Sequence, residues 1–177
     1  MILLDITIKN IVSELVKQNN TSNPYELASI LNISVFHEDL GTINGYYNKP
    51  LRMKQIHINC LLNEHDAEYT CAHELGHAIL HPNANTPFLR SNTLISVDKM
   101  EIEANSFAVN LLIPDEKIRE GIEKYYTSKQ LSRLLGYNQK LIELRLKTFC
   151  HSNPSNISSS FIFMCGNSFK TISVSAL

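Results

Sequence analysis

Apolar residues recur at helical spacing along much of this chain, and this pattern predicts most of its structure. Ile8, Val12 and Leu15 fall on one side of a first helix, with polar residues on the other side. Asn23 suits the N-cap of a second helix, and Pro24 suits its first position. The pattern predicts helices over residues 6–18, 25–31, 63–81, 98–112, 115–125, 128–135 and 139–149.

A different pattern, made of short stretches of β-branched and aromatic residues, lies between the second and third predicted helices. The stretches 33–36, 45–47 and 55–59 are separated by Gly, Asn and Pro residues, which are typical of turns. We expect them to pair as a small antiparallel sheet of about three strands. The predicted fold class is therefore α+β, a compact and mostly helical domain.

The chain of 177 residues is long enough for one well-buried core, with or without a small appendage. We expect residues 1–126 to form the main domain and residues 127–150 to form a helical C-terminal element that packs on it. Residues 151–177 are a tail rich in Ser and Asn, and their pattern assigns them no role.

Composition and charge narrow the range of functions. Hydrophobic residues make up 44% of the chain and charged residues 19%, which is ordinary for a soluble globular protein. The formal net charge is −1, so the chain lacks the positive field that would hold it on nucleic acid or on an anionic membrane. No apolar run approaches the roughly 20 residues of a membrane helix, and no basic region precedes an apolar stretch at the start. We therefore expect a cytoplasmic protein.

The four cysteines, Cys60, Cys71, Cys150 and Cys165, show no C-x-x-C spacing. This scatter argues against a thiolate metal site and against a disulfide scaffold. We expect the cysteines to be small buried hydrophobic residues.

The residues with the clearest chemistry are His73, Glu74 and His77. The two histidines are four positions apart, so on a helix their rings project from one side and can bind one ion. Imidazole suits Zn²⁺, and a coordination position left open can hold a water molecule. Glu74 lies one position round the helix, within reach of that water, and can take its proton. The spacing predicts a zinc site with Glu74 as the catalytic base.

A catalytic zinc site needs a third protein ligand, and the candidates are His81, Asp98, Glu101 and Glu103. His81 lies one turn beyond His77, so we place it at the end of the helix, beside the site but not on the metal. Glu101 shares a side of its predicted helix with small and apolar residues, whereas Glu103 lies on another side. A buried carboxylate is costly unless it is paired or metal-bound, so we favour Glu101 as the ligand and keep Glu103 as the second choice.

Two blocks of sequence together resemble the ImmA/IrrE family of metallopeptidases. The first runs from His73 to His81, HELGHAILH, and the second combines EIEANSFA at residues 101–108 with LLIP at residues 111–114. The similarity extends over residues 5–147 and leaves the tail outside. It implies a compact zincin-like fold with a gluzincin-like site, in which the first acid of the second block, Glu101, is the third ligand.

The same resemblance implies a substrate. Family members of this size are typically encoded by mobile elements or prophages, and they cleave a helix-turn-helix repressor that keeps the element silent. We therefore expect a zinc endopeptidase that acts as an anti-repressor, with a protein partner and without direct contact with DNA or membrane. The pattern does not indicate an oligomeric state.

The way in which the substrate is held can also be predicted. We expect it to lie extended along a sheet edge at residues 56–59, where it would add a strand through backbone hydrogen bonds. Tyr46, Tyr47 and Arg90 are the candidates for stabilising the oxyanion, and Asn105 is a candidate for a hydrogen bond near the site.

Two alternative functions stay open at this point. One is a regulatory module that contains metal and binds a repressor without cutting it. The other is DNA binding through residues 128–147, which have a helix-turn-helix pattern. The charged residues of that segment are Lys129, Arg133, Lys140, Arg145, Lys147 and Glu143. Its regular apolar positions favour packing over DNA contact.

Overall fold

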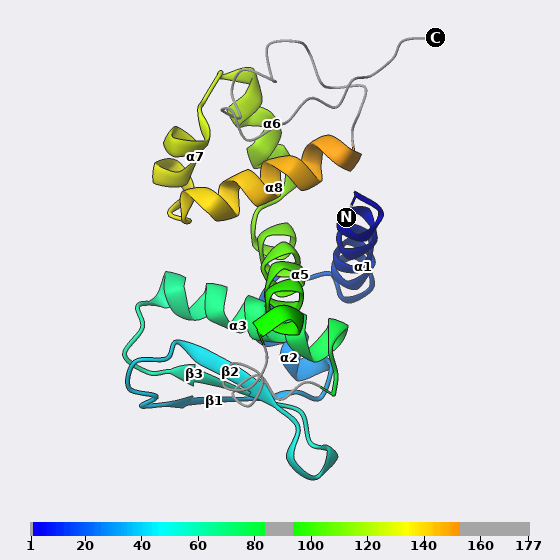
Figure 1. Cartoon of the computed structure of the whole chain (residues 1–177), viewed down its shortest axis with the longest axis vertical. Helices are drawn as coiled ribbons and strands as arrows, with labels where there is room; N and C mark the ends of the chain where they lie inside the picture. Colours follow the sequence, from blue (N-terminus) through cyan, green and yellow to red (C-terminus); the bar gives the residue numbers. More distant parts are fainter. Residues whose placement is uncertain (1, 84–93, 153–177) are drawn as a thin grey trace. The chain divides into compact units, whose positions relative to one another are not determined.

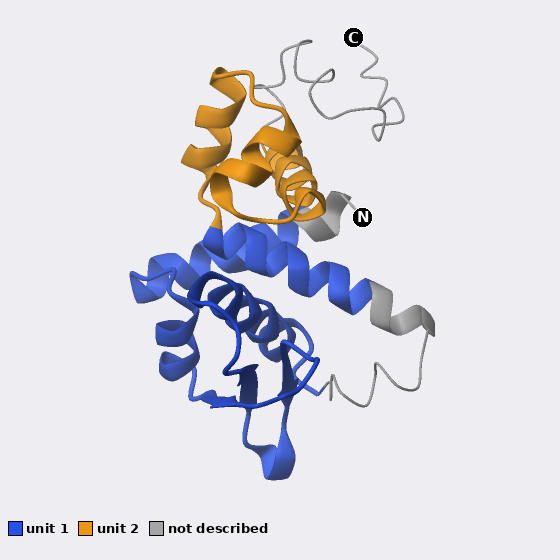
Figure 2. Ribbon diagram, turned by 90° about the vertical axis from the view of Figure 1, so that its left-hand side faces the viewer, with its two compact units in different colours: residues 1–112 blue, residues 113–177 orange. Residues whose placement is uncertain are grey.

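The computed structural model describes residues 2–83 and 94–152 of the chain (Figure 1). The protein divides into two compact units, residues 1–112 and residues 113–177 (Figure 2). The domain boundary expected after residue 126 stays a prediction. In the structure, the helix over residues 115–123 already belongs to the second unit. Arg90, Cys165 and the Ser/Asn-rich tail beyond residue 152 lie outside the described residues.

The first unit combines helices with three short strands. Its described elements are α1 (Ile2–Asn19), α2 (Pro24–Ile30), β1 (Ser34–Glu38), β2 (Gly45–Asn48), the 3-10 helix η1 (Pro50–Arg52), β3 (Gln55–Asn59), α3 (Glu64–Leu80) and α5 (Leu94–Leu112). Asn23 caps α2 as predicted, because its side chain accepts hydrogen bonds from the backbone N–H groups of Tyr25 and Glu26. Helix α5 begins four residues before the predicted start, so Asp98 lies within it.

The sheet is mixed, and the expectation of a wholly antiparallel sheet is wrong. The strand order is β1-β3-β2; β2 pairs antiparallel with β3, but β1 pairs parallel with β3. The reason lies in the connections. Strands β1 and β2 run in opposite directions, and β3 inserts between them. Because β3 is antiparallel to β2, it must be parallel to β1.

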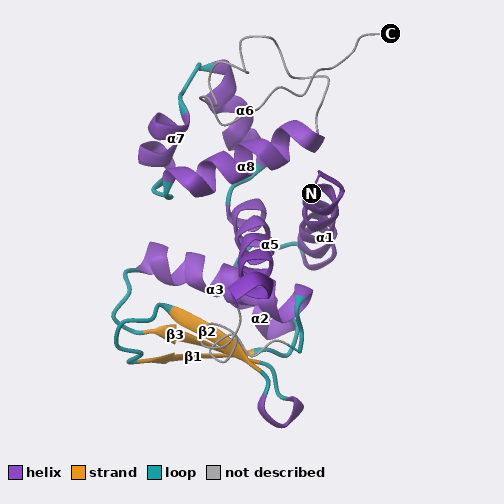
Figure 3. Ribbon diagram, viewed as in Figure 1, coloured by secondary structure: helices purple, strands orange, loops and turns teal. Residues whose placement is uncertain are grey.

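Helices cover one side of this sheet (Figure 3). Helix α3 packs on β2 and β3, and α5 packs against both α3 and α1. Ile56 and Ile58 of β3 point into the resulting core and are fully buried, as are Leu75 of α3 and Phe107 of α5. Helix α3 therefore lies in the middle of the unit, with the sheet on one side and α5 on the other.

The second unit contains α6 (Asp115–Glu123), α7 (Ser128–Leu135) and α8 (Gln139–Ser152). Thr127 and Gln130 form a capping box at the start of α7. Gly136 ends α7 in the left-handed region, with a φ of 79°, where glycine has no steric penalty. Leu131 and Ile142 are buried, in agreement with the packing role expected for the apolar positions of this segment, whereas Leu134 is 65% exposed and does not fit it.

Arg145 corrects one premise of the DNA-binding alternative. This side chain is only 1% exposed. Its Nε donates to the backbone carbonyl of Ile113 at 2.9 Å, and its guanidinium pairs with the carboxylate of Asp115. Arg145 therefore holds the second unit together and is not available to a phosphate backbone.

The cysteines follow their prediction only in part. Cys71 and Cys150 are buried, whereas Cys60 is exposed because it comes directly after β3, where the chain turns. Burial raises the pKa of the Cys71 thiol to about 12. Among the helices of the described residues, none has both the length and the hydrophobicity that crossing a membrane requires.

Candidate metal centre

Helix α3 carries the predicted histidine pair and the glutamate between them. Its N-cap is Asn63, whose side chain accepts from the backbone N–H of Asp66 at 2.9 Å. Every residue from Thr70 to Ala78 is buried in the middle of this helix. His73 is 7% exposed, and Glu74 and His77 are each 1% exposed. The motif therefore lies inside the core-packed part of the helix.

Three side chains converge within this core. The Nε2 atoms of His73 and His77 are 3.2 Å apart. The two carboxylate oxygens of Glu101, on α5, lie 3.2 Å from Nε2 of His73 and 3.4 Å from Nε2 of His77. Among the described residues, these three are the one group of His, Cys, Asp and Glu side chains with the spacing of a metal site.

The spacing of these atoms fits zinc. Ligand atoms about 2.05 Å from a tetrahedral ion are about 3.3 Å from one another. The two Nε2 atoms have this separation, and each of them has it to one oxygen of Glu101. The chemistry of the donors agrees, since a neutral imidazole carries only one N–H. Two Nε2 atoms that face each other at 3.2 Å need a proton or a cation between them.

The charge state of Glu101 also suits a metal ligand. Burial alone would raise the pKa of this carboxyl group, but hydrogen bonds with His73 and His77 outweigh burial and hold the pKa well below its usual range. Glu101 is therefore ionised at neutral pH, the form that binds a cation.

A glycine brings the two helices of the cluster together. A Cβ atom on Gly76 would lie 3.2 Å from Cα and from the carbonyl oxygen of Ala104, and 3.1 Å from Cβ of Phe107. These distances are tighter than ordinary contacts, so α3 and α5 approach this closely because residue 76 has no side chain. Ala104 lies one turn after Glu101, and the close approach sets the distance from that carboxylate to the histidines.

Glu103 corrects the argument that chose Glu101. Burial was the criterion, yet the side chain of Glu103 is 10% exposed and that of Glu101 is 28% exposed. Helix α5 is covered by both α1 and α3, so its sides cannot be sorted simply into inward and outward. Glu103 does not join the cluster. Its Oε2 lies 3.0 Å from Nε2 of His81, the residue that ends α3 where we expected it.

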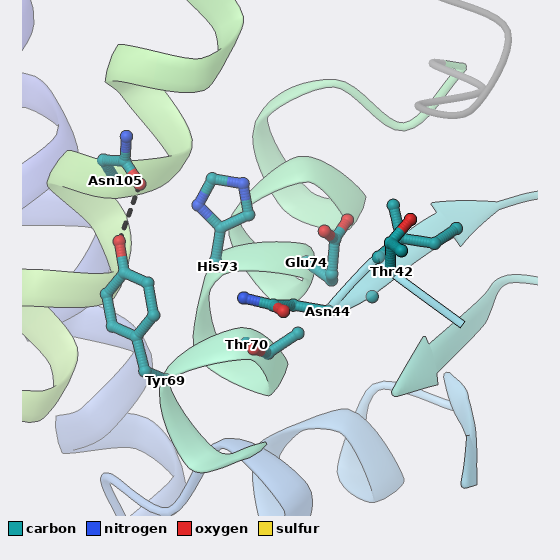
Figure 4. A pocket seen from close by; sticks show the side chains of 9 residues that line it. Thr42, Asn44, Tyr69, Thr70, His73, Glu74 and Asn105 are labelled. Carbon is teal, nitrogen blue, oxygen red and sulfur yellow. Dashed lines mark hydrogen bonds between the residues drawn. The ribbon is translucent and has the colours of Figure 1, made fainter. Parts of the chain in front are cut away.

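A pocket of about 320 Å³ opens beside this cluster (Figure 4). His73 and Glu74 both project from α3 toward it. The other residues that line it are Thr42, Ile43, Asn44, Gly45, Tyr69, Thr70 and Asn105. Gly45 lets the start of β2 lie directly against α3, because a Cβ atom there would be 2.5 Å from Cγ2 of Thr70. The pocket wall is mostly polar, with Glu74 as its one acidic side chain, and the pocket is wide enough for a side chain.

Several predicted residues are placed by this geometry, and others were missed. Asn105 lines the pocket and accepts a hydrogen bond of 2.7 Å from the hydroxyl of Tyr69. Tyr69 was not predicted, although it lies one turn before His73 on the same side of α3, a spacing that could have revealed it. Tyr47 is fully buried and its hydroxyl donates to the carbonyl of Pro82 at 3.0 Å, while Tyr46 stacks on the ring of His57. Neither tyrosine lines the pocket.

Comparison with known proteins identifies relatives of this chain. The IrrE N-terminal-like domain of peptidase family M78 matches residues 28–147, which include the whole cluster. The chain is 46% identical over 139 residues to the uncharacterized immunity region protein 2 of Bacillus phage phi105, covering 78% of this chain and 88% of that protein. It is 34% identical over 117 residues to the metallopeptidase ImmA of Bacillus subtilis strain 168, covering 65% of this chain and 68% of that protein.

Proposed function

Because this chain belongs to the ImmA/IrrE-type metallopeptidase family, we propose that it is a zinc-dependent endopeptidase of the gluzincin type. In this proposal His73, His77 and Glu101 hold the zinc ion, and Glu74 is the catalytic base. The observation that carries it is the set of three ligand-atom separations, 3.2, 3.2 and 3.4 Å, beside a pocket that Glu74 lines.

The mechanism divides the work between the ion and the protein. Zinc, when bound, lowers the pKa of a coordinated water to about 7 and polarises a carbonyl oxygen. Glu74 takes the proton of the attacking water and then delivers it to the nitrogen of the leaving amine. Its burial beside His73 favours this role, since a carboxylate with little access to bulk water keeps the proton within the site. His73 and His77 are held in register by α3, so their nitrogens face one point.

The place of the substrate has to be revised. Residues 56–59 belong to β3, which is paired on both sides and offers no free edge. Strand β2 is an edge of the sheet, and residues 42–45 at its start line the pocket beside Glu74. We propose that the substrate runs along β2 and places one side chain in this pocket, where Asn44 and Asn105 offer amide groups to a polar side chain.

Support for a particular kind of substrate comes from the relatives. One of them is named as an immunity region protein of a phage, and the family resemblance implies a helix-turn-helix repressor. We propose that such a repressor of a prophage or mobile element is cleaved, so that this protein is an anti-repressor. The cytoplasm is the site of action in this proposal, because that is where a repressor meets its DNA.

The decisive experiment compares the unsubstituted protein with Glu74→Gln. Both are analysed for zinc and incubated with the repressor of the same element, and the products are separated by mass. We expect about one zinc per chain in both proteins and cleavage only by the unsubstituted one. Removing the base should slow cleavage by about 10²- to 10⁴-fold.

Other outcomes would point to the alternatives. Absence of zinc after reconstitution would exclude the metallopeptidase. Zinc together with repressor binding, but without cleavage under any condition, would support the non-cleaving regulatory module. For DNA binding, a gel shift at low salt is the sensitive assay, because phosphate contacts weaken steeply as salt rises; we expect no shift.

A further inference from the structure

Glu101 approaches the histidines from a different helix, so its position depends on how firmly α5 is fastened to α3. The two helices make polar contacts at two points near this carboxylate. One contact joins His81 to Glu103, and the other joins Tyr69 to Asn105. Neither pair belongs to the three-residue cluster or takes part in the proton transfer proposed above, although Tyr69 and Asn105 also line the pocket.

The first contact lies at the end of α3. Nε2 of His81 is 3.0 Å from Oε2 of Glu103, within ion-pair distance but without the geometry of a hydrogen bond. Both side chains are largely buried, at 17% and 10% exposed. The ring centroid of His81 also lies 5.9 Å from that of His77, which is one turn earlier in the chain. Lys99 stands 3.7 Å from the other oxygen of Glu103, but it is 73% exposed and can contribute little.

The second contact lies one turn before His73 on α3 and one turn after Glu101 on α5. The hydroxyl of Tyr69 donates to Oδ1 of Asn105 at 2.7 Å, a short hydrogen bond across the helix interface (Figure 4). This pair therefore fastens α5 to α3 on the other side of the cluster from His81 and Glu103.

We propose that these two pairs form a clamp that positions Glu101, and that Glu103 acts on the metal through His81 and α5 and is not itself a ligand. The inference rests on the proposed zinc site. Metal ligands are held in place by neighbouring residues that do not touch the ion, and loss of such a neighbour commonly weakens metal binding by about 10- to 100-fold.

The alternative role of Glu103, as a ligand, disagrees with the geometry. Its oxygens face His81 and Lys99, not the Nε2 atoms of His73 and His77. A ligand and a positioning residue also differ in effect. Loss of a ligand should abolish stoichiometric binding, whereas loss of a positioning residue should leave one zinc per chain at reduced affinity.

The test measures zinc affinity by competition with a chelating dye, and thermal unfolding of the metal-free protein, for a set of variants. Glu103→Gln keeps the size of the side chain and removes its charge; we expect about 10- to 100-fold weaker zinc binding with one zinc per chain. Tyr69→Phe removes one neutral hydrogen bond and should weaken binding by about 2- to 12-fold. Combined, the two factors should multiply, since the contacts are separate.

Two controls separate positioning from general loss of stability. Lys99→Ala removes the exposed partner of Glu103 and should leave zinc affinity within twofold. Ile118→Val shortens a fully buried side chain of the second unit, so it should lower the unfolding temperature without changing zinc affinity.

The results that would overturn the clamp are distinct from those that would overturn the proposed function. If Glu103→Gln binds zinc as tightly as the unsubstituted protein, or loses it completely as Glu101→Gln should, the clamp is wrong while the zinc site stands. If the unsubstituted protein binds no zinc, both proposals fail.

Discussion

Gly76→Ala tests how closely α3 and α5 must approach for Glu101 to reach the histidines. The substitution adds one methyl group in the middle of a buried helix. That methyl carbon would lie 3.2 Å from Cα and the carbonyl oxygen of Ala104 and 3.1 Å from Cβ of Phe107. Two of these three atoms are backbone, so α5 itself has to move by a few tenths of an ångström.

Two opposing effects set the magnitude for stability. Alanine is a better helix former than glycine by about 0.8–1.0 kcal/mol. Overpacking a closely packed interface costs about 1–3 kcal/mol. The metal-free protein should therefore lose about 0–2 kcal/mol of unfolding free energy. Zinc affinity should also fall, by about tenfold, which corresponds to 1.4 kcal/mol. The reason is that Glu101 lies one turn from Ala104 and moves with it away from the two histidines.

The assay combines urea denaturation of the metal-free protein with zinc competition, and Gly121→Ala is the matched control. Gly121 also lies within a helix, α6, and a Cβ atom there would be 2.6 Å from Cδ2 of Leu131. We expect Gly121→Ala to change stability alone. Zinc affinity equal in Gly76→Ala and the unsubstituted protein would refute the argument that this approach sets the position of Glu101.

Three further predictions concern single side chains. In native protein, a thiol reagent at pH 8 should label Cys60 quickly and leave Cys71 unmodified, because burial raises the pKa of Cys71 to about 12; peptide mass mapping checks this, and rapid labelling of Cys71 would contradict it. Arg145→Met should lower the unfolding free energy by about 1–3 kcal/mol in urea denaturation, because the buried carbonyl of Ile113 loses this donor and Asp115 loses this ion pair. Metal-free Glu101→Gln should be less stable than the unsubstituted protein at pH 7, and the difference should shrink below about pH 4.3. The sign of this effect follows because the pKa of Glu101 is lower in the folded protein than in the unfolded chain. The ionised carboxylate therefore stabilises the fold fully above the unfolded-state pKa, and this stabilisation is lost as the pH falls. A stability difference that stays constant with pH would contradict the prediction.

The helices and the histidine pair could be predicted because they depend on neighbours in sequence. Residues three or four positions apart share a helix side, so the spacing of His73 and His77 already implies facing rings. The N-cap at Asn23 could be predicted for the same reason, because its side chain bonds to backbone groups only two and three residues later. The parallel pairing of β1 was missed because it depends on where a later strand inserts, which no short segment determines.

The choice between two glutamates shows where reasoning from burial fails. Glu103 is the more buried acid because it has a partner of its own in His81, so its burial indicates a polar contact and not a metal. Glu101 is the more exposed of the two acids, yet its oxygens are the ones that face both histidines. Within the described residues, a better criterion than burial is which carboxylate faces both Nε2 atoms, and that criterion needs three dimensions.

The site is assembled from segments that only the tertiary structure brings together. Helix α3 provides His73, Glu74 and His77, α5 provides Glu101, and the residues before β2 provide the far wall of the pocket. The other two segments approach α3 closely at glycines. The start of β2 meets α3 at Gly45, and α5 meets α3 at Gly76. Both glycines therefore control geometry without taking part in chemistry. A larger residue at either position would move the two histidines away from the pocket wall or from Glu101, although every functional group would still be present in the sequence.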